Sequence, residues 1–581
     1  MVPFFGRTTR WRRSPRSVVV VLGIVACMSV SGCSDEEPKV SGDWSYPNVP
    51  WVDPPACGAS VSRPPSLIEG PSEAGFDGAL AAKAHGFDRV FHVFNAAGTG
   101  VNADVSVPPE WTDQREAIRA FVQDQTGWDF EGHSGKTVRD VVGQWHKVAG
   151  AYAGVGIAAD AYYYGTLRDE GAPCEDVDRA RQFVIANLDA LHLATAITGV
   201  PGVIARGFAR RDLPGSESIE TVPLFDATGK PLPEEKNNGT WREDNAGLYP
   251  EYVWEDSCSR DMLIGWVIGM AAVWEVTALD PTIPQDRKDR LRNDASAIAR
   301  SLMQVGDRGY DLEVHDADGR ITYHGYINEN ALDRGYLAGA ANGMYGIMAL
   351  GIVGGLSYVS REPDIVQYLR QDLIERRGLH LFARDNMLLD AGLLSNYSGY
   401  NMAFQGAWLA YRYLPEEPAR DVIREAIATS LYARPGASRQ PSEQKQTFYD
   451  FVQAVSAGRG TAFGPMTGPP DEGARARGME TLTEFWEPPY FAQNRLNCDD
   501  AEIESGQCIG IDGTPIQVLG YVGRNGELVA SGPVPMRIRP ASNYYWRSNP
   551  YAVNGGDDSG LYAANDFRFC YWMARWVTSG P

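Results

Sequence analysis

The chain has 581 residues, of which 44% are hydrophobic and 11% aromatic, so it can bury a large core. Its formal net charge is -21 at pH 7, and loss of the five N-terminal arginines would give -21 - 5 = -26. Such an acidic chain is repelled by phosphate backbones, which argues against a nucleic-acid partner.

The first 33 residues predict an export signal that ends at a lipidated cysteine. Five arginines and no acidic residue precede an apolar run from Val18 to Val30, an order typical of signal peptides. The run ends in Val30-Ser31-Gly32-Cys33, which resembles a lipobox, so Cys33 would become the lipidated first residue of the mature chain. We therefore expect a lipid-anchored protein of the cell envelope. Ser34 favours the outer membrane or the cell surface.

Residues 34–65 predict a flexible tether. The stretch from Asp35 to about Pro65 is rich in Pro, Ser and Asp, a composition typical of linkers that hold a domain away from a bilayer. The folded domain is therefore expected over residues 66–581.

The cysteines predict disulfides rather than a metal site. The chain has 8 cysteines, and 8 - 2 = 6 remain after Cys27 in the signal and Cys33 at the anchor. An even number permits up to three disulfides in an exported protein. Cys498 and Cys508 are the best pair because they would close a short polar loop; the other pairings stay open. No CxxC or HExxH spacing occurs, so we expect neither a metal nor a cofactor.

One helical unit recurs from residue 137 onwards. A helix rich in Gly, Ala and aromatic residues is followed each time by an amphipathic helix. The first kind is apolar all round and must be buried on all sides, whereas the second buries one stripe, which predicts an inner and an outer layer. The predicted pairs are 137–164 with 175–198, 259–279 with 285–305, 331–353 with 362–377, and 399–414 with 417–432, followed by a helix near 442–455 and a last apolar helix at 560–578.

Through this alternation, residues 137–580 resemble the six-hairpin glycosidase-like (α/α)6 toroid proteins. The helix start Ser259-Arg260-Asp261, before a helix spaced by Gly265 and Gly269, also resembles uncharacterised exported bacterial lipoproteins. The resemblance implies an all-α (α/α)6-type toroid. Four helix pairs can be recognised in the sequence. Closure of the toroid with six pairs depends on the N-terminal region and on the stretch after Ser442.

Two long insertions interrupt the helical pattern, at residues 210–254 and 488–545. The second contains a predicted small β-hairpin near 514–532, with a turn at Arg524-Asn525-Gly526. Loops of this length in a compact domain are usually functional edges.

The starts of the inner helices predict a substrate-binding mouth, because the N-termini of inner helices converge at one end of a toroid. Acids and amides precede several of them, although these residue types also cap helices. Glycoside hydrolysis needs two carboxylates across the scissile bond, one acting as acid and the other as base or nucleophile. The predicted catalytic residues are Asp256, Asp557 and Asp558, with Glu487 in reserve.

Aromatic and polar side chains near these helix starts predict a sugar-binding surface. Aromatic rings stack on the apolar faces of sugars, although such rings also fill loop cores. Arginine can bind a uronate or a sulfate, although beside a first-turn aspartate it is more often part of an ion pair. The predicted binding residues are Trp254, Arg260, Asn396, Asn401, Trp486, Tyr490, Tyr545, Trp546 and Arg547. Arg206 is a further anion-binding candidate, and His324 is a candidate base for a lyase reaction.

The leading functional hypothesis is an exported carbohydrate-active enzyme, either a glycoside hydrolase or a polysaccharide lyase, with a polysaccharide substrate in the mouth of a toroid. The competing hypothesis is a non-catalytic lipoprotein that binds glycans or a protein through the same mouth. A third hypothesis, a terpene-cyclase-like toroid, is disfavoured because the chain has no Asp-x-Asp-Asp motif.

Overall fold

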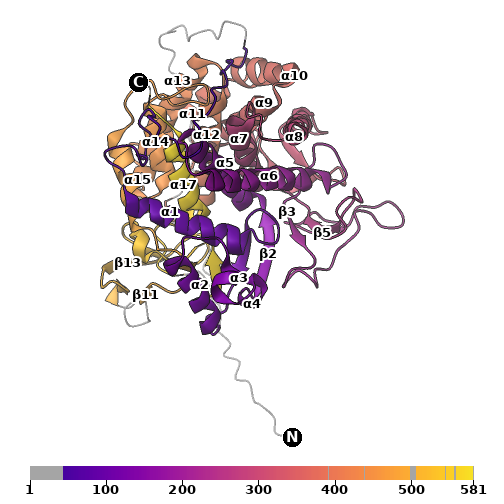
Figure 1. Cartoon of the computed structure of the whole chain (residues 1–581). Coiled ribbons are helices and arrows are strands. Elements are labelled where there is room, and N and C mark those ends of the chain that lie inside the picture. Colours follow the sequence, from indigo (N-terminus) through magenta and orange to yellow (C-terminus); the bar gives the residue numbers. More distant parts are fainter. Residues whose placement is uncertain are drawn as a thin grey trace. The chain divides into compact units, whose positions relative to one another are not determined.

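Figure 1 shows a computed structural model of the chain, which describes residues 44–389, 392–437, 439–497, 505–542, 545–554 and 558–579. Helices dominate these residues, as the sequence predicts, but a seven-stranded antiparallel sheet and smaller sheets accompany them. The prediction of an all-α chain is therefore wrong. The predicted signal peptide and Cys33 lie outside the described residues.

Six buried helices form the inner layer. They are α5 (Gly150–Asp169), α7 (Arg260–Thr277), α9 (Gly343–Ser360), α12 (Tyr397–Tyr413), α14 (Thr447–Ala457) and α17 (Asn565–Trp576). Their glycines allow close backbone approach: a Cβ on Gly154 of α5 would overlap the Gly265 carbonyl of α7, and one on Gly351 of α9 would overlap the Gly406 carbonyl of α12. Helix α9 is long and apolar enough to cross a membrane, but it is wholly buried and serves as a core helix.

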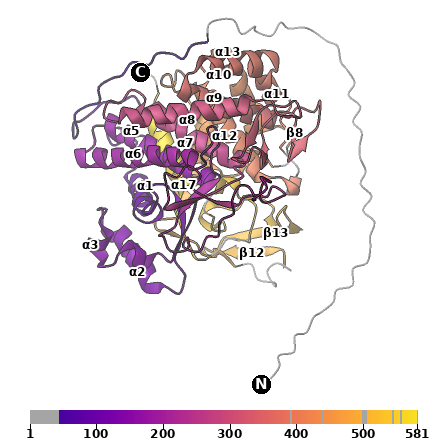
Figure 2. The same ribbon diagram turned by 90° about the vertical axis from the view of Figure 1, so that its right-hand side faces the viewer.

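Amphipathic helices cover this inner layer. The outer helices are α1 (Gly78–Val90) continued by η1 (Phe91–Asn95), α6 (Cys174–Ala196), α8 (Gln285–Met303), α10 (Pro363–Gln367) continued by η2 (Tyr368–Arg376), α13 (Glu417–Glu425) continued by η4 (Ala426–Ala433), and α15 (Glu472–Glu484). In α8, for example, Leu291, Ile298 and Leu302 are buried on one stripe. Figure 2 shows α8 alongside α6 and α9, which it contacts.

The inner helices contact one another in a closed cycle, α5 to α7, α9, α12, α14, α17 and back to α5. The first four predicted pairs are present. Helices α14 and α15 make a fifth pair, and α17 packs against α1, which comes from the other end of the chain (Figure 1). The sixth pair therefore could not be found by looking for neighbours in sequence.

Three predicted inner helices begin later than expected, the last of them because residues 560–562 form β15 (Gly560–Tyr562) before α17 starts. Residues 138–149 form α4 (Val138–Val141) and β2 (Gln144–Ala149) before α5 starts. Residues 331–336 form the hairpin of β8 (Ala331–Leu332) and β9 (Gly335–Tyr336), because Asp333 adopts a left-handed conformation with φ 53° and reverses the chain.

The seven-stranded sheet crosses the N-terminal ends of three inner helices. Its order is β10-β15-β1-β2-β3-β5-β4. The strands are β1 (Ala103–Ser106), β2, β3 (Gly207–Arg210), β4 (Trp241–Glu243), β5 (Tyr252–Glu255), β10 (Tyr490–Phe491) and β15 (Gly560–Tyr562). Strand β2 runs directly into α5, β5 leads into α7, and β15 leads into α17. The sheet therefore fixes where these helices start.

The predicted insertions contribute strands instead of staying irregular. The first supplies β4 and β5. The second supplies β10 and a four-stranded sheet of β11 (Leu496–Asn497), β12 (Gln507–Gly510), β13 (Pro515–Val522) and β14 (Leu528–Ala530). Strands β13 and β14 pair antiparallel at the site of the predicted hairpin. Cys508 is buried in this sheet, whereas Cys498 lies outside the described residues, so the Cys498–Cys508 pair stays a prediction.

Smaller elements complete the described part of the chain. They are α2 (Thr112–Asp124), α3 (Phe130–Ser134), α11 (Leu379–Asp385), β6 (Glu313–His315), β7 (Ile321–Tyr326) and the short helical turns η3 (Gly392–Leu394), η5 (Pro441–Glu443), η6 (Met536–Ile538) and η7 (Tyr545–Arg547).

A buried arginine joins the last inner helix to two helices from the start of the chain. Arg568 Nε lies 2.7 Å from Asp88 Oδ1 of α1, and its Nη2 lies 2.6 Å from Asp160 Oδ1 of α5. All three side chains are fully buried. Burial alone would raise the pKa of Asp160, but contacts with His92 and Arg568 outweigh it and lower that pKa to about 2. Since burial lowers the pKa of His92 and favours its neutral form, Arg568 supplies the permanent positive charge.

We expect Arg568→Met to lower the free energy of unfolding by about 3–5 kcal/mol, because two buried carboxylates would lose their shared counter-ion. The midpoint of urea denaturation measures this loss. Arg300→Met is the matched control: Arg300 pairs with Asp364 at 2.8 Å but is 47% exposed, so the expected cost is below about 1 kcal/mol. Equal losses in the two variants would contradict a special role for Arg568.

Candidate functional site

A cavity of about 560 Å³ opens at the N-terminal end of α5, beside strands β1, β2 and β15. We call it the mouth cavity. Its polar lining comes from Asp104 on β1, from Gln144, His146 and Lys147 on β2, and from Tyr152 in the first turn of α5, and its aromatic lining includes Trp241 and Tyr562. The cavity therefore combines ionisable groups with aromatic surface at the end of the inner layer where the sequence predicts a mouth.

Arg547 ties together the starts of three inner helices beside this cavity. Its Nη1 donates to the Tyr152 hydroxyl of α5 at 2.8 Å, its Nε donates to Ser398 Oγ of α12 at 3.1 Å, and its Nη2 lies 3.1 Å from Asp261 Oδ2 of α7. Arginine suits this position because its planar fork offers several donors in fixed directions. Arg547 thereby fixes the orientation of the Tyr152 side chain that lines the cavity.

Arg547 contacts one deprotonated group, Asp261, and one protonated group, Tyr152. Burial would raise the pKa of Asp261, but the Arg547 guanidinium and the Ser259 hydroxyl outweigh it and lower that pKa, so Asp261 is a carboxylate at neutral pH. Burial raises the pKa of Tyr152, and nearby Asp104 and Asp261 raise it further, although Arg547 acts in the opposite direction. Tyr152 therefore keeps its proton and can act as a donor.

A second ion cluster lies next to Lys147. Lys147 Nζ is 2.5 Å from Glu255 Oε2 at the end of β5, and Arg206 Nε is 3.5 Å from the same oxygen. Arg206 Nη1 also donates to Ser259 Oγ, the residue before α7, at 2.8 Å. Charges of both signs thus line the junction between the sheet and the inner helices.

The predicted catalytic residue Asp256 does not line this cavity. It is fully buried, accepts hydrogen bonds from Arg242 Nη2 at 2.6 Å and from the Thr240 amide at 2.8 Å, and lies 2.9 Å from Lys236 Nζ. Lys236 in turn contacts Asp316 and Asp318. These contacts give Asp256 a structural role, which is to hold the first insertion against the sheet.

The other predicted catalytic residues are dispersed. Glu487 is 74% exposed and pairs with Lys83 at 2.9 Å. Asp558 is exposed, and its backbone carbonyl accepts a hydrogen bond from Arg115. Asp557 lies outside the described residues. The structure therefore does not bring Asp256, Asp558 and Glu487 together in the mouth cavity.

Four predicted binding aromatics are core residues. Trp254 donates through Nε1 to the Glu243 carbonyl at 2.8 Å, Tyr490 contacts Tyr545 through the hydroxyls at 2.5 Å, and Trp546 stacks on Phe448 with ring centroids 4.3 Å apart. All four are buried, so they offer no exposed face to a sugar. Packing in the protein core, rather than contact with a sugar, therefore accounts for these four rings.

The remaining predicted binding residues are not all in one place: some lie at or near the starts of inner helices and others lie elsewhere. Arg260 donates to the Asp333 carbonyl at 3.0 Å, and His324 Nδ1 lies 3.4 Å from the Asp333 carboxylate. Asn396 is half-buried at the start of α12, while Asn401 is buried within that helix.

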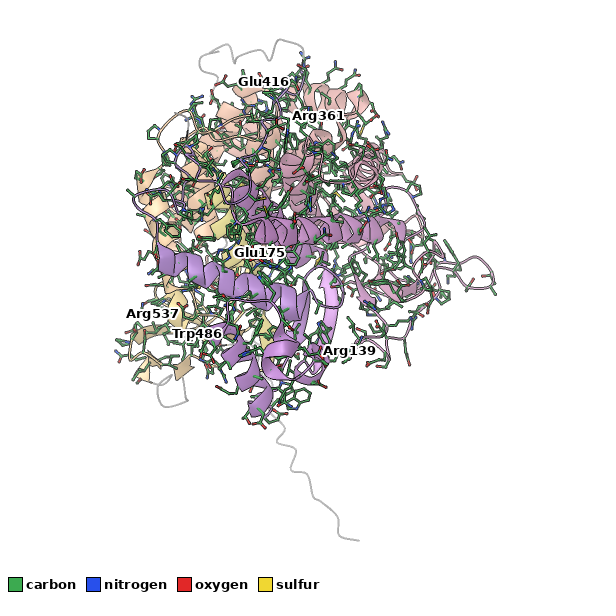
Figure 3. The ribbon with its side chains drawn as sticks, viewed as in Figure 1. Arg139, Glu175, Arg361, Glu416, Trp486 and Arg537 are labelled. Carbon is green, nitrogen blue, oxygen red and sulfur yellow. The ribbon has the colours of Figure 1, made fainter. Side chains whose placement is uncertain are left out.

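Trp486 is half-buried, lies under the Arg495 guanidinium at 4.0 Å, and is found beside the small four-stranded sheet (Figure 3). Among the predicted binding residues, Arg547 contacts the cavity lining through Tyr152, and the buried Tyr490 contacts it through Tyr562, with ring centroids 5.2 Å apart.

Sequence reasoning missed Asp104, His146, Lys147 and Tyr152. Asp261 was visible as part of the Ser259-Arg260-Asp261 helix start, and Tyr152 could have been found as an aromatic in the first turn of an inner helix. The residues on β1 and β2 left no such signal, because both strands are short and pair with segments distant in sequence.

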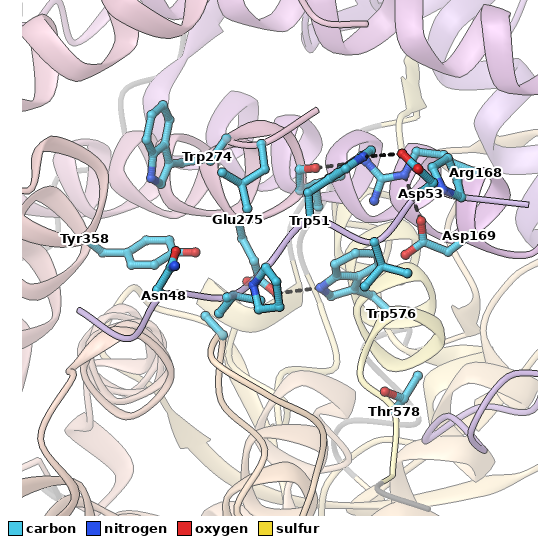
Figure 4. A pocket seen from close by; sticks show the side chains of 18 of the residues that line it. Asn48, Trp51, Asp53, Arg168, Asp169, Trp274, Glu275, Tyr358, Trp576 and Thr578 are labelled. Atoms are coloured by element: carbon cyan, nitrogen blue, oxygen red, sulfur yellow. Dashed lines mark hydrogen bonds and ion pairs between the residues drawn. The ribbon is translucent and has the colours of Figure 1, made fainter. Parts of the chain in front are cut away.

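A second cavity, of about 640 Å³, lies at the C-terminal ends of the inner helices (Figure 4). Trp51, Trp274, Tyr358 and Trp576 line it, and residues 48–55 form part of its wall. Glu275 at this end accepts hydrogen bonds from the Tyr413 hydroxyl at 2.9 Å and Trp576 Nε1 at 2.5 Å, and it also pairs with Arg412. Glu275 is thus committed to joining inner helices.

The sequence matches no family model, and the search of curated proteins found no match. Among solved structures, a sugar epimerase from a ruminal bacterium shares 10% identity with a TM-score of 0.34, covering 74% of this chain and 92% of that chain. A cellulase of C. cellulolyticium in complex with cellobiose shares 9% identity with a TM-score of 0.35, covering 87% of this chain and 99% of that chain. At this level the two likenesses indicate neither an activity nor the roles of residues.

We expect Asp256→Asn to lower the free energy of unfolding by about 3 kcal/mol, because Arg242 and Lys236 would lose a buried counter-charge. Urea denaturation measures the loss, and faster trypsin cleavage within residues 210–254 would locate it. Glu235→Gln, an exposed carboxylate in the same insertion, is the control and should leave both unchanged. Unchanged stability together with loss of a measured activity would restore Asp256 as a catalytic candidate.

Proposed function

We propose that the protein is a carbohydrate-active enzyme whose substrate binds in the mouth cavity. The observation that carries this proposal is the meeting of aromatic surface, from Trp241 and Tyr562, with ionisable side chains, from Asp104, Lys147 and Tyr152, in one cavity. Sugars present apolar ring faces and hydroxyl edges, so their sites combine aromatic side chains with a few placed polar groups. The cavity volume falls within the range of small-ligand sites.

The fold part of this proposal is an (α/α)6 toroid with an added sheet. Its support is the cyclic contact of six inner helices, each with an outer helix packed against it. In such an arrangement the N-terminal ends of the inner helices form one mouth, and the mouth cavity lies there.

Asp104 and Tyr152 are the proposed catalytic pair. Cleavage of a glycosidic bond, by hydrolysis or by elimination, needs one group that donates a proton and another that accepts one or stabilises developing charge. The raised pKa of Tyr152 keeps its hydroxyl protonated for the first role. Asp104, whose charge acts on Tyr152 from the same cavity, takes the second. Arg547 is a positioning residue that orients Tyr152.

The competing proposal is a glycan-binding protein without catalysis. The observation that favours it is the pairing of the neighbouring carboxylates, since Glu255 contacts Lys147 and Asp261 contacts Arg547. Carboxylates held in this way shape a binding site without supplying a mobile proton.

A panel of neutral and uronate-containing polysaccharides tests the enzyme proposal. We expect release of reducing ends or of unsaturated uronates, and a fall in rate of at least about 100-fold in Asp104→Asn and in Tyr152→Phe. Glu110→Gln, an exposed carboxylate four residues beyond β1, should keep the wild-type rate. Glycan binding that survives in all variants without turnover by the wild type would favour the binding protein, and neither binding nor release would refute both.

We also propose that the chain is an exported lipoprotein of the cell envelope, anchored in a membrane through Cys33. The support is the sequence alone: an arginine-rich start, an apolar run and a lipobox-like end. Cells fed an alkyne-tagged fatty acid should label the wild-type protein, and Cys33→Ser should abolish the label while Cys57→Ser keeps it. A label that persists in Cys33→Ser would refute the anchor.

A further inference from the structure

Residues 44–65 run along the C-terminal ends of the inner helices, and we call them the strap. Its first anchor is Tyr46, whose hydroxyl donates to Ser357 Oγ of α9 at 2.8 Å. The Tyr46 ring lies edge-on to Tyr358, with ring centroids 5.8 Å apart, and also contacts Phe463. The predicted tether thus includes a stretch with specific contacts, although its flexibility stays a prediction.

The second anchor of the strap is the turn between α5 and α6. The Gly58 amide donates to the Gly171 carbonyl at 2.7 Å and to the Ala172 carbonyl at 3.0 Å. Arg63 pairs with Glu170 at 3.0 Å. Gly171 has φ 65°, and a Cβ there would lie only 2.7 Å from the Ala59 carbonyl oxygen, so the close approach of the strap depends on glycine at this position.

This second anchor brings two cysteines from distant parts of the chain into contact. Cys57 precedes Gly58, and Cys174 is the first residue of α6, three positions after Gly171. Both side chains are exposed. A hydrogen bond between the two thiols is the main cause that raises the pKa of Cys174. Among the described residues, the other free thiols, Cys258 and Cys570, are both buried.

We propose that Cys57 and Cys174 form a disulfide that fastens the strap to the turn before α6. The backbone hydrogen bonds of Gly58 hold the two residues side by side, and both thiols are accessible to an oxidant. The cross-link would join positions 174 - 57 = 117 residues apart, so it restricts the unfolded chain strongly. It would also fix one wall of the second cavity, because residues 48–55 lie between the two anchors of the strap.

The reaction is thiol–disulfide exchange with a small-molecule or protein disulfide as oxidant. The thiolate of one cysteine attacks the oxidant and forms a mixed disulfide, and the other thiolate then displaces the second half. One S–S bond of the oxidant breaks and one S–S bond forms in the protein. The two cysteine thiols lose two electrons and two protons, and the oxidant leaves as two thiols.

Oxidised glutathione provides the test on the native full chain. After incubation, alkylation of remaining thiols and proteolysis, mass spectrometry should find the Cys57 peptide joined to the Cys174 peptide, with Cys258 and Cys570 still alkylated as thiols. In Cys57→Ser, Cys174 should instead carry glutathione, which shows that it is reachable by the oxidant. Separate glutathione adducts on both cysteines of the wild type, or two unreacted thiols, would overturn the proposal.

A stability measurement gives an independent readout. Reduction should lower the melting temperature of the wild type by at least about 2 °C more than that of Cys57→Ser, because any other disulfide, such as the predicted Cys498–Cys508 pair, is reduced in both. Gly171→Ala is a second probe: it should displace the strap and reduce the yield of the cross-link without removing either thiol. A full yield in Gly171→Ala, or an equal effect of reduction on the melting temperatures of the wild type and Cys57→Ser, would contradict a disulfide that depends on the docked strap.

Discussion

The contact of Arg568 with Asp88 and Asp160 joins the two ends of the helical layers. Arg568 lies on the last inner helix, Asp88 on the first outer helix and Asp160 on the first long inner helix, and all three side chains are fully buried. Buried charges are stable only when paired and hydrogen-bonded, and here Asn187, His92 and Trp572 supply further hydrogen bonds to the two carboxylates. This contact adds to the packing of α17 against α5 and α14 and ties α17 to α1.

Closure of the helix cycle in turn brings the proposed site together. Tyr152, Asp261 and Ser398 begin three different inner helices, and they can share one guanidinium only when those helices are held at the right spacing. The glycine contacts between α5 and α7 set that spacing at its closest point. Strands β2, β5 and β15 then fix the level at which α5, α7 and α17 start, and so the depth of the mouth cavity.

The alternation of inner and outer helices could be predicted because it is a local property of each helix. The helix 343–360 is apolar on every side, so its own residues predict that it is buried. The strands β1 and β15 are too short to show a periodic pattern of comparable length. The pairing of α17 with α1 could not be predicted from the sequence either, since it joins segments nearly 500 residues apart.

For the same reason, the sequence did not distinguish between individual candidate residues of the site. Asp256 and Asp261 stand five positions apart and look equally eligible in the sequence. One ends buried beneath an insertion against Arg242, and the other reaches Arg547 at the helix starts. Asp256 directly follows β5, whereas Asp261 lies in the first turn of α7. Their partners, Arg242 and Arg547, come from other segments of the chain, and no local pattern in the sequence reveals these contacts.

The pairing of the first and last segments also constrains the order of folding. Residues 66–68 pair with residues 574–578 through backbone contacts, in addition to the Arg568 contacts. During synthesis, Asp88 and Asp160 are made more than 400 residues before Arg568. Until the last helix arrives, both carboxylates must stay hydrated, so the first helices cannot reach their final packing while the chain is still growing. Completion of this fold is therefore an event of the finished chain, because its first helices wait for a partner that is made last.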